Sequence, residues 1–300
     1  MNVQLKLKKS HLLPDFPSGS SINFRDGKLF LIGDDANNVL VLDSAYNRVD
    51  SKRLFDFPEK RIPKPVKADL ETSAVITLGG KDFLMILGSA STGTREKAFI
   101  IPFLESDLDV PHFRVVHTDI FASRLLGGGI SEVNIEGSTV IGKHLLLSNR
   151  GNRGHLTNHF AITEVDFWER QASALLKIVP VKIPVVADDA PSVSELCYVD
   201  KLDMLLMVLS SEHTSNAYDD GIIGNSYIGW IENITGKMQA PILTIDQIVS
   251  LTSVHRDFNN EKVEGLCVET VNGMELTLHL VSDNDNGESK LFKIGMTLTR

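Results

Sequence analysis

One pattern of polar and hydrophobic positions recurs along the whole chain. An acidic or hydroxyl residue precedes a short apolar strand, and a turn, a second and more apolar strand and a polar loop follow it. The copies begin at Ser20, Glu71, Glu136, Ser194 and Glu264. The last two copies align residue for residue, because SELC in one matches EGLC in the other. Self-similarity at a regular spacing predicts a repeat architecture.

The first two strands of each copy are joined by residues that suit tight hairpins. Asn, Asp and Gly accept the positive φ angles of such turns. The turns are Asp26-Gly27, Gly79-Gly80, Gly142-Lys143, the weaker Asp200-Lys201-Leu202-Asp203, and Asn272-Gly273. Further strand-like runs follow the polar loops, at 39–42, 98–103, 159–165, 226–231 and 290–294. Four strands per repeat of roughly fifty to seventy residues are typical of a propeller blade.

Five copies predict an all-β, five-bladed β-propeller that occupies residues 1–300 as a single domain. The fifth copy leaves room for about three strands before the C-terminus. The strand-like run at 3–7 has no blade of its own, so we expect it to close the ring. Six blades and a β-sandwich are the competing folds. Short helices are expected at 118–126 and 246–251, between blades.

Composition indicates a folded, water-soluble protein. Hydrophobic residues make up 42% and charged residues 23% of the chain. We find no apolar run of about 18 residues and no signal-peptide pattern, so no membrane association is expected. The expected location is the cytoplasm, unless a leader has been removed. Polar blade rims demand no partner, and a monomer is the default expectation.

Charge and motifs narrow the classes of function. A net charge of −9 argues against a nucleic-acid partner, which would need a cationic surface. Cys197 and Cys267 lie in apolar stretches without zinc-site spacing, and we interpret them as buried thiols. The chain contains no GxSxG, P-loop, HExxH or GxGxxG after a strand. Any hydrolysis is therefore expected to be metal-assisted.

The residues that open the five repeats form a candidate metal site. The first strand of every blade lines the central channel of a propeller, so equivalent positions converge on the axis. This predicts a ring in which three carboxylates repel one another, and a hard cation would resolve the repulsion. Oxygen-only ligands favour calcium over magnesium or sodium. The alternative is that these side chains only cap strands and meet channel water. The ring is Ser20, Glu71, Glu136, Ser194 and Glu264.

The order Ser, Glu, Glu, Ser, Glu on five blades resembles the calcium-activated nucleotidase (apyrase) family. Those proteins are five-bladed propellers whose axial calcium is held by that set of side-chain types. The phrases VEGLCVE and LVSDNDNG also resemble the phytase-like esterase propellers. The resemblance covers most of the chain as a repeat plan and implies the fold and the metal. The other characteristic segments of the nucleotidases are missing, so nucleotide hydrolysis does not follow from the ring.

The polar loops that follow the second strands are expected to wall a pocket over this ring. Arginine forks bind phosphate or carboxylate, which predicts an anionic substrate. A carboxylate or histidine in these loops would activate water, while calcium polarises the substrate. Solvated loop charges are the alternative interpretation. The expected substrate-binding residues are Lys67, Arg95, Arg150 and Arg153, and the catalytic candidates are Asp34, Glu212, His213 and Asp283.

These inferences predict a calcium-dependent hydrolase of a phosphoester or another anionic ester. The alternative is a non-catalytic propeller with structural calcium, whose face binds a protein or a small ligand. Lactonase or sugar-processing activity would need a defined base near the metal, and the sequence singles out none.

Overall fold

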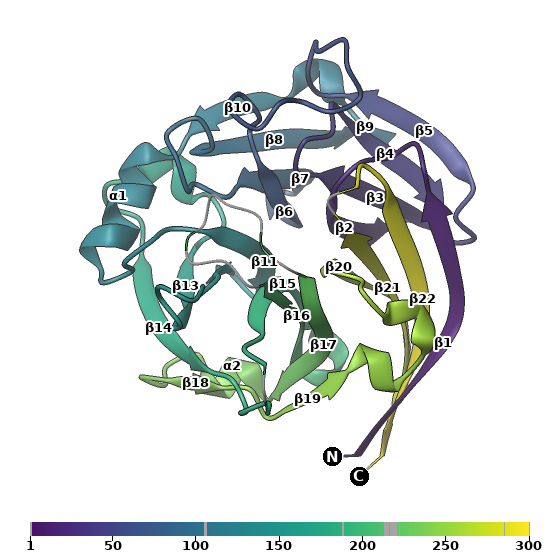
Figure 1. Cartoon of the computed structure of the whole chain (residues 1–300). Helices are drawn as coiled ribbons and strands as arrows, with labels where there is room; N and C mark the ends of the chain where they lie inside the picture. The colour runs from purple at the N-terminus through teal and green to yellow at the C-terminus, as the bar shows by residue number, and fades with distance from the viewer. Residues whose placement is uncertain are drawn as a thin grey trace.

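Five β-sheets stand around a common axis (Figure 1). The structure is a computed structural model that describes residues 2–104, 107–187, 189–212, 216, 221, 223–284 and 286–299. In each sheet the innermost strand lies against the innermost strands of the two neighbouring sheets. The predicted all-β, five-bladed propeller is confirmed.

The blades follow one another in chain order. Blade 1 is β2 (Gly19–Arg25), β3 (Lys28–Gly33), β4 (Asn38–Asp43) and β5 (Arg48–Arg53). Blade 2 is β6 (Leu70–Leu78), β7 (Lys81–Gly88), β8 (Lys97–Leu104) and β10 (Arg114–His117), with β9 (Asp107–Leu108) beside β8. Blade 3 is β11 (Ile135–Ile141), β12 (His144–Asn149), β13 (Asn158–Glu164), β14 (Leu176–Lys182) and the short β18 (Leu243–Thr244). Blade 4 is β15 (Ser192–Val199), β16 (Met204–Glu212), β17 (Ile223–Glu232) and β19 (Gln247–Ser250).

Blade 5 combines both ends of the chain. Its inner strands are β20 (Val263–Asn272), β21 (Glu275–Asp283) and β22 (Ser289–Thr299). The outermost strand is β1 (Asn2–Leu13), which pairs antiparallel with β22. The N-terminal strand therefore closes the ring, as the sequence predicts, and the two termini lie side by side (Figure 1).

A β-bulge interrupts the inner strand of every blade at the same position. In blade 2, Leu70 is opposite Gly88 and Thr72 is opposite Leu87, so Glu71 is the extra residue. The equivalent extra residues in the other blades are Ser20, Glu136, Ser194 and Glu264. Because bulges redirect side chains, this shared irregularity sets all five residues apart from the regular ladder. The structure thus confirms that the five repeat starts are equivalent.

The hairpin turns agree with the sequence in all five blades. Gly27, Gly80, Gly142 and Gly273 have φ angles between 60° and 78°. In blade 4 a short 3-10 turn ends at Asp203, whose φ is 46°. Left-handed positions are costly for most residues and cheap for Gly and Asp. These residues therefore keep the inner strand pairs in register.

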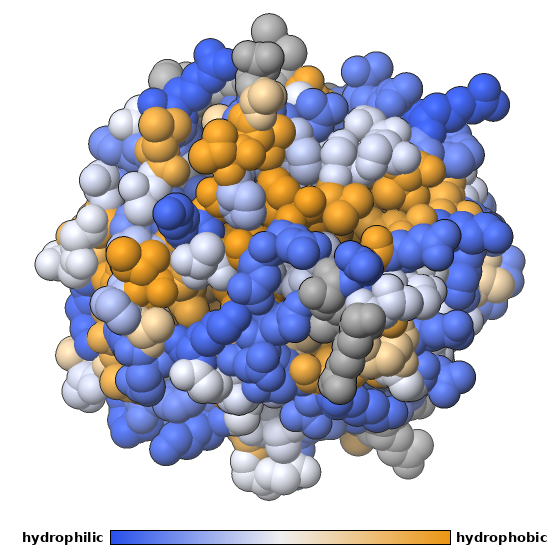
Figure 2. Space-filling view, turned by 90° about the horizontal axis from the view of Figure 1, so that it is seen from below, coloured by the Kyte–Doolittle hydropathy of each residue, from blue (hydrophilic) through white to orange (hydrophobic). Residues whose placement is uncertain are grey.

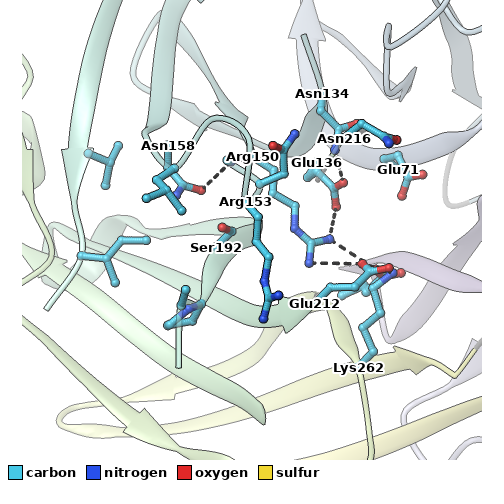
Figure 3. A pocket seen from close by; sticks show the side chains of 18 of the residues that line it. Glu71, Asn134, Glu136, Arg150, Arg153, Asn158, Ser192, Glu212, Asn216 and Lys262 are labelled. Carbon is cyan, nitrogen blue, oxygen red and sulfur yellow. Dashed lines mark hydrogen bonds and ion pairs between the residues drawn. The ribbon is translucent and has the colours of Figure 1, made fainter. Parts of the chain in front are cut away.

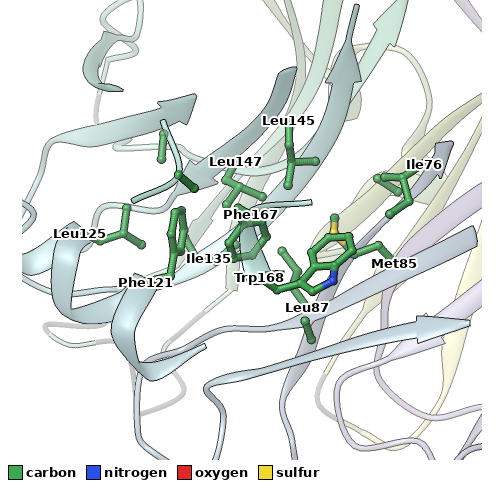
Figure 4. Packing of buried hydrophobic residues seen from close by; sticks show 14 of the residues in the cluster. Ile76, Met85, Leu87, Phe121, Leu125, Ile135, Leu145, Leu147, Phe167 and Trp168 are labelled. Carbon is green, nitrogen blue, oxygen red and sulfur yellow. The ribbon is translucent and has the colours of Figure 1, made fainter. Parts of the chain in front are cut away.

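The hydrophobic core is divided between the blades. Among the described residues, buried apolar side chains form one cluster at each of the five blade interfaces. Figure 4 shows the cluster between blades 2 and 3, where Phe121 and Phe167 pack against strand residues such as Leu147. Each blade is buried on both faces, so no blade has a core of its own.

Helices are few, and one sequence prediction is wrong. Helix α1 (Asp119–Gly127) matches the predicted segment 118–126. The segment 246–251 is mainly strand β19, because the β-branched Ile248 and Val249 suit the outer strand that blade 4 needs beside β17. Helix α2 (Ile234–Lys237) is a single turn. Short 3-10 turns lie at Val110–His112, Phe167–Arg170, Asp200–Leu202, Leu251–Ser253 and Arg256–Phe258.

Figure 2 shows the molecule from below the view of Figure 1, with hydrophobic side chains gathered in a band among hydrophilic ones. Part of a folded surface is always apolar. In the described part of the chain, no helix has the length and hydropathy to span a membrane.

A buried histidine lies at the interface of blades 5 and 1. His279 is fully buried, and its Nδ1 and Nε2 contact the Tyr46 hydroxyl at 2.9 Å and the Glu269 carboxylate at 3.1 Å. Burial lowers the pKa of His279 to about 4, although Glu269 opposes the shift. The usual pKa of histidine is about 6.5. Between these values the unfolded chain binds more protons than the folded one.

We therefore expect stability to fall as the pH is lowered from about 6.5 to 4, with His279 contributing about 2–3 kcal/mol to that loss. Urea unfolding across this range should show a shallower pH dependence for His279→Gln than for the wild type. His117→Gln, at an exposed position, should leave the slope unchanged. Parallel slopes for His279→Gln and the wild type would refute this assignment.

Candidate functional site

A pocket of about 690 Å³ opens at one end of the axis, where the inner strands begin. The loops after the second strands of the blades line it, through Asp34, Arg95, Arg150, Glu212 and Asp283. The sequence-based prediction that these loops gather at one face is therefore correct. Such a concave site at the axis is the place where a small ligand would bind.

The predicted ring divides into two groups in the structure. Glu71, Glu136 and Glu264 line the pocket. The two serines are buried and hydrogen-bonded: Ser20 Oγ donates to the Ser18 carbonyl, and Ser194 Oγ bonds Ser210 Oγ at 2.7 Å. Only the three glutamates of the ring therefore face the pocket.

Arg150 lies among the carboxylates of the pocket (Figure 3). Its guanidinium nitrogens lie 3.3 Å from Glu136, 3.6 Å from Glu212 and 3.9 Å from Glu264. Burial alone would lower the pKa of Arg150, but these carboxylates raise it above its ordinary value. The repulsion that predicted a metal is thus relieved in part by a cation of the protein itself.

Lys262 completes this network. Its Nζ lies 3.0 Å from Glu212 and 2.9 Å from Glu264. Burial would raise the pKa of Glu212, but Lys262 and Arg150 lower it to about 2. A carboxylate with so low a pKa is a weak base at neutral pH. The predicted catalytic role of Glu212 gains no support from this environment.

A second charged cluster lies on the blade 1 and blade 2 side of the pocket. The Nζ of Lys67 forms ion pairs with Asp34 and, at 2.8 Å, with Asp69. Arg95 binds the other oxygen of Asp69 at 2.7 Å. Burial raises the pKa of Asp34 to about 6, although Lys67 opposes the shift. Lys67 and Arg95, predicted to bind substrate, therefore bind carboxylates of the pocket.

Four of the five ring residues already contact protein partners. The serine hydroxyls of the ring are turned to protein partners, and two of its glutamates pair with Arg150 and Lys262. Among the described residues the acidic group with metal-like spacing is instead Asp34, Asp69 and Glu71, whose ligand oxygens lie within 4.8 Å of one another. Lys67 already supplies a positive charge there. Calcium at the ring stays a prediction.

Glu71 and Arg153 are ionisable side chains of the pocket without a partner among the described residues. Glu71 makes no hydrogen bond or ion pair there, and burial, with Asp69 and Glu136, raises its pKa well above the ordinary value. Arg153 is exposed at the pocket rim and is likewise unpaired within the described chain. These are the groups that a ligand can engage without breaking an existing ion pair.

The remaining catalytic candidates are placed differently. Asp283 is buried in the pocket lining, and its backbone N–H donates to the Lys262 carbonyl. His213 lies outside the described residues. The structure thus brings Asp34, Glu212 and Asp283 to the pocket, while their roles stay predictions.

Glu195 joins the inner strands of four blades. This buried carboxylate of blade 4 accepts hydrogen bonds from the hydroxyls of Ser21 and Thr72 and from the N–H groups of Ser138 and Leu196. Burial raises its pKa to about 8. Its bonds tie four blades together, so we assign it a structural role.

The positions two residues before the five ring residues were not predicted from the sequence to belong to the site. Four of them line the pocket, with Asp69, Asn134, Ser192 and Lys262, and the fifth is Ser18. Asn134 donates to Glu136 at 2.7 Å, and Lys262 pairs with Glu264. The signal was available in the repeat, because each of these positions directly precedes the inner strand of its blade or, at Ser192, begins it.

A family model matches residues 15–296, and it describes a family of unknown function, DUF6929. A search of curated proteins found no match. Among solved structures, a glutaminyl cyclase from Myxococcus xanthus is similar, with a TM-score of 0.55 and 12% identity over 99% of this chain and 97% of that one. The tail fibre of Staphylococcus aureus phage P68 gives a TM-score of 0.51 and 11% identity over 99% of this chain and 53% of the fibre chain.

At this identity the likenesses show the fold alone. The structure itself shows the five blades implied by the resemblance to the nucleotidases, and neither of these two similar structures is a nucleotidase. Calcium binding and ester hydrolysis stay predictions.

Proposed function

The chain belongs to the family of unknown function DUF6929, and we propose that its axial pocket binds and hydrolyses a small anionic ester. The observation that carries the proposal is a pair of ionisable groups without a partner among the described pocket residues, the Glu71 carboxyl and the Arg153 guanidinium. The other cations described above already pair with carboxylates.

In this proposal Arg153 binds the anionic group, because a guanidinium fork matches the oxygens of a carboxylate or phosphate. Glu71 moves the proton. Water adds to the acyl or phosphoryl centre, the bond to the leaving oxygen breaks, and Glu71 gives that oxygen a proton. A proton of the attacking water then returns to Glu71, so the carboxyl group is restored.

The anion-binding role is tested with two esters that differ in charge. Mono-4-nitrophenyl succinate carries a free carboxylate, and 4-nitrophenyl butyrate is neutral. We expect kcat/KM to favour the anionic ester by about tenfold or more, since a hydrogen bond to a charged group contributes about 1.5–3 kcal/mol. Arg153→Gln should abolish this preference. A preference that survives the substitution would exclude Arg153 as the anion site.

Calcium-assisted hydrolysis is the second candidate, and the spacing of Asp34, Asp69 and Glu71 favours it. Oxygen ligands at this separation suit calcium. Calcium that binds only the folded chain would raise its stability by about 2.7 kcal/mol at a hundredfold excess over Kd.

Melting curves with 5 mM calcium and with a chelator measure this directly. Because Lys67 already pairs with Asp34 and Asp69, we expect the same Tm with calcium and with the chelator. A calcium-dependent rise in Tm that Asp69→Asn removes would instead support the metal site.

A further inference from the structure

An apolar wall faces the charged residues of the pocket. It is formed by the turn after β12, by the end of β14 and by the segment between β14 and β15. We call it the apolar wall, and its residues are Leu156, Val181, Ile183, Val185, Val186 and Pro191.

Two apolar side chains of this pocket are strongly exposed, whereas two of its charged side chains are buried. Val185 is 98% and Leu156 is 70% exposed, whereas the charged Arg150 and Lys67 are each 8% exposed. Large apolar side chains at the surface of a pocket lower their free energy when a ligand covers them. The pocket therefore offers burial to an apolar group.

Both parts of the wall are anchored. Val186 and Asp189 form an isolated β-bridge, and Asp189 accepts hydrogen bonds from the Tyr227 hydroxyl at 2.6 Å and from Asn225 at 3.2 Å. In the other segment, Asn152 and His155 exchange backbone hydrogen bonds of 2.9 and 3.1 Å. A fixed turn thus carries Arg153 and ends beside Leu156.

We propose that the natural ligand is an amphipathic anion, with its charged head on Arg153 and a hydrocarbon chain on the apolar wall. The inference rests on the proposed function, from which it takes the anion site. The head and the chain come from one molecule because Arg153 and Leu156 lie three residues apart and line the same pocket. The substrate class is accordingly an ester that carries both an acidic group and a medium-length aliphatic part.

Binding is measured by calorimetry with unbranched carboxylates from butyrate to decanoate, which the protein cannot hydrolyse. Each buried methylene contributes about 0.8 kcal/mol, so Kd should fall two- to fourfold per added carbon until the wall is covered. Octyltrimethylammonium, with the opposite head charge, should bind at least tenfold more weakly than nonanoate, which carries the same octyl chain. Affinity that is independent of chain length, or equal for the cation, would overturn the proposal.

Variants of the wall residues show where the hydrocarbon chain of the ligand binds. Leu156→Ser and Val185→Ser should each weaken the binding of decanoate several-fold and leave the binding of butyrate nearly unchanged. Arg153→Gln should weaken the binding of carboxylates of every chain length by the same factor. Leu104→Ser is the matched control, because Leu104 is 69% exposed and does not line the pocket. Equal effects of Leu156→Ser and Leu104→Ser on decanoate binding would show that the hydrocarbon chain does not bind the apolar wall.

Chain-length-dependent binding without any ester turnover would remove the proposed hydrolysis and leave this inference standing. Turnover of short anionic esters, with carboxylate binding that does not depend on chain length, would support the proposed hydrolysis and remove this inference.

Discussion

Replacing Glu71 with glutamine is expected to lower kcat for an anionic ester by a factor of about 10²–10⁴, the range that a positioned proton donor contributes. The amide keeps the size of the side chain but cannot give up a proton and take one back. Glu71 makes no hydrogen bond with another described residue, so the substitution should leave the folded structure intact. Steady-state kinetics and urea unfolding of the same preparation measure both effects.

Glu275→Gln is the matched control for this variant. Glu275 is exposed and begins β21, at the hairpin end of the inner strands and away from the pocket. Its replacement should change neither kcat nor stability. If Glu71→Gln retains more than half of the wild-type kcat, Glu71 is not the proton donor and the mechanism fails.

Replacing Arg150 with methionine is expected to destabilise the fold by about 3–5 kcal/mol, because it leaves buried carboxylates without their partner. Arg150 pairs with Glu136, Glu212 and Glu264 in a site where its side chain is 8% exposed. Without it the pKa values of Glu212 and Glu264 should rise, because Arg150 lowers both. A carboxyl group whose pKa is higher in the folded than in the unfolded state makes the protein less stable as the pH rises. The destabilisation by Arg150→Met should therefore be larger at pH 8 than at pH 5.

Urea unfolding at both pH values tests this, with Arg170→Met as the control. Arg170 pairs with Glu164 at 3.1 Å, but its side chain is 55% exposed, and surface ion pairs contribute about 0–1 kcal/mol. A loss of less than 1 kcal/mol for Arg150→Met would show that Arg150 does not neutralise the axial carboxylates.

The fold was predictable because its determinants are local and repeated. Each inner hairpin carries a turn with a positive φ angle, and Asp26-Gly27 and Gly79-Gly80 are read directly from the sequence. The ring positions were found by alignment of the repeats, and the shared bulge confirms them. Closure by β1 followed from counting strands.

The charge pairing in the pocket could not be predicted in the same way. Arg150 follows β12 and Lys262 precedes β20, more than a hundred residues apart, yet both contact Glu212. Their partners depend on how far each side chain reaches across the axis, which no local pattern encodes. The sequence therefore indicated a metal where the fold places two cations of its own.

The prediction of a helix at 246–251 was wrong for a related reason. Its polar and apolar spacing suits a short helix, but blade 4 lacks an outer strand without it, and pairing with β17 decides the conformation. Tertiary context overrides weak local propensity in such segments.

The central claim is that the side chains of the axial pocket hydrolyse an anionic ester. The most direct measurement is turnover by the purified full chain of mono-4-nitrophenyl succinate, mono-4-nitrophenyl suberate and 4-nitrophenyl phosphate, each with calcium and with excess chelator. The account predicts turnover of at least one of these esters that the chelator leaves unchanged and Glu71→Gln abolishes. No turnover of any of them above the uncatalysed rate would contradict it.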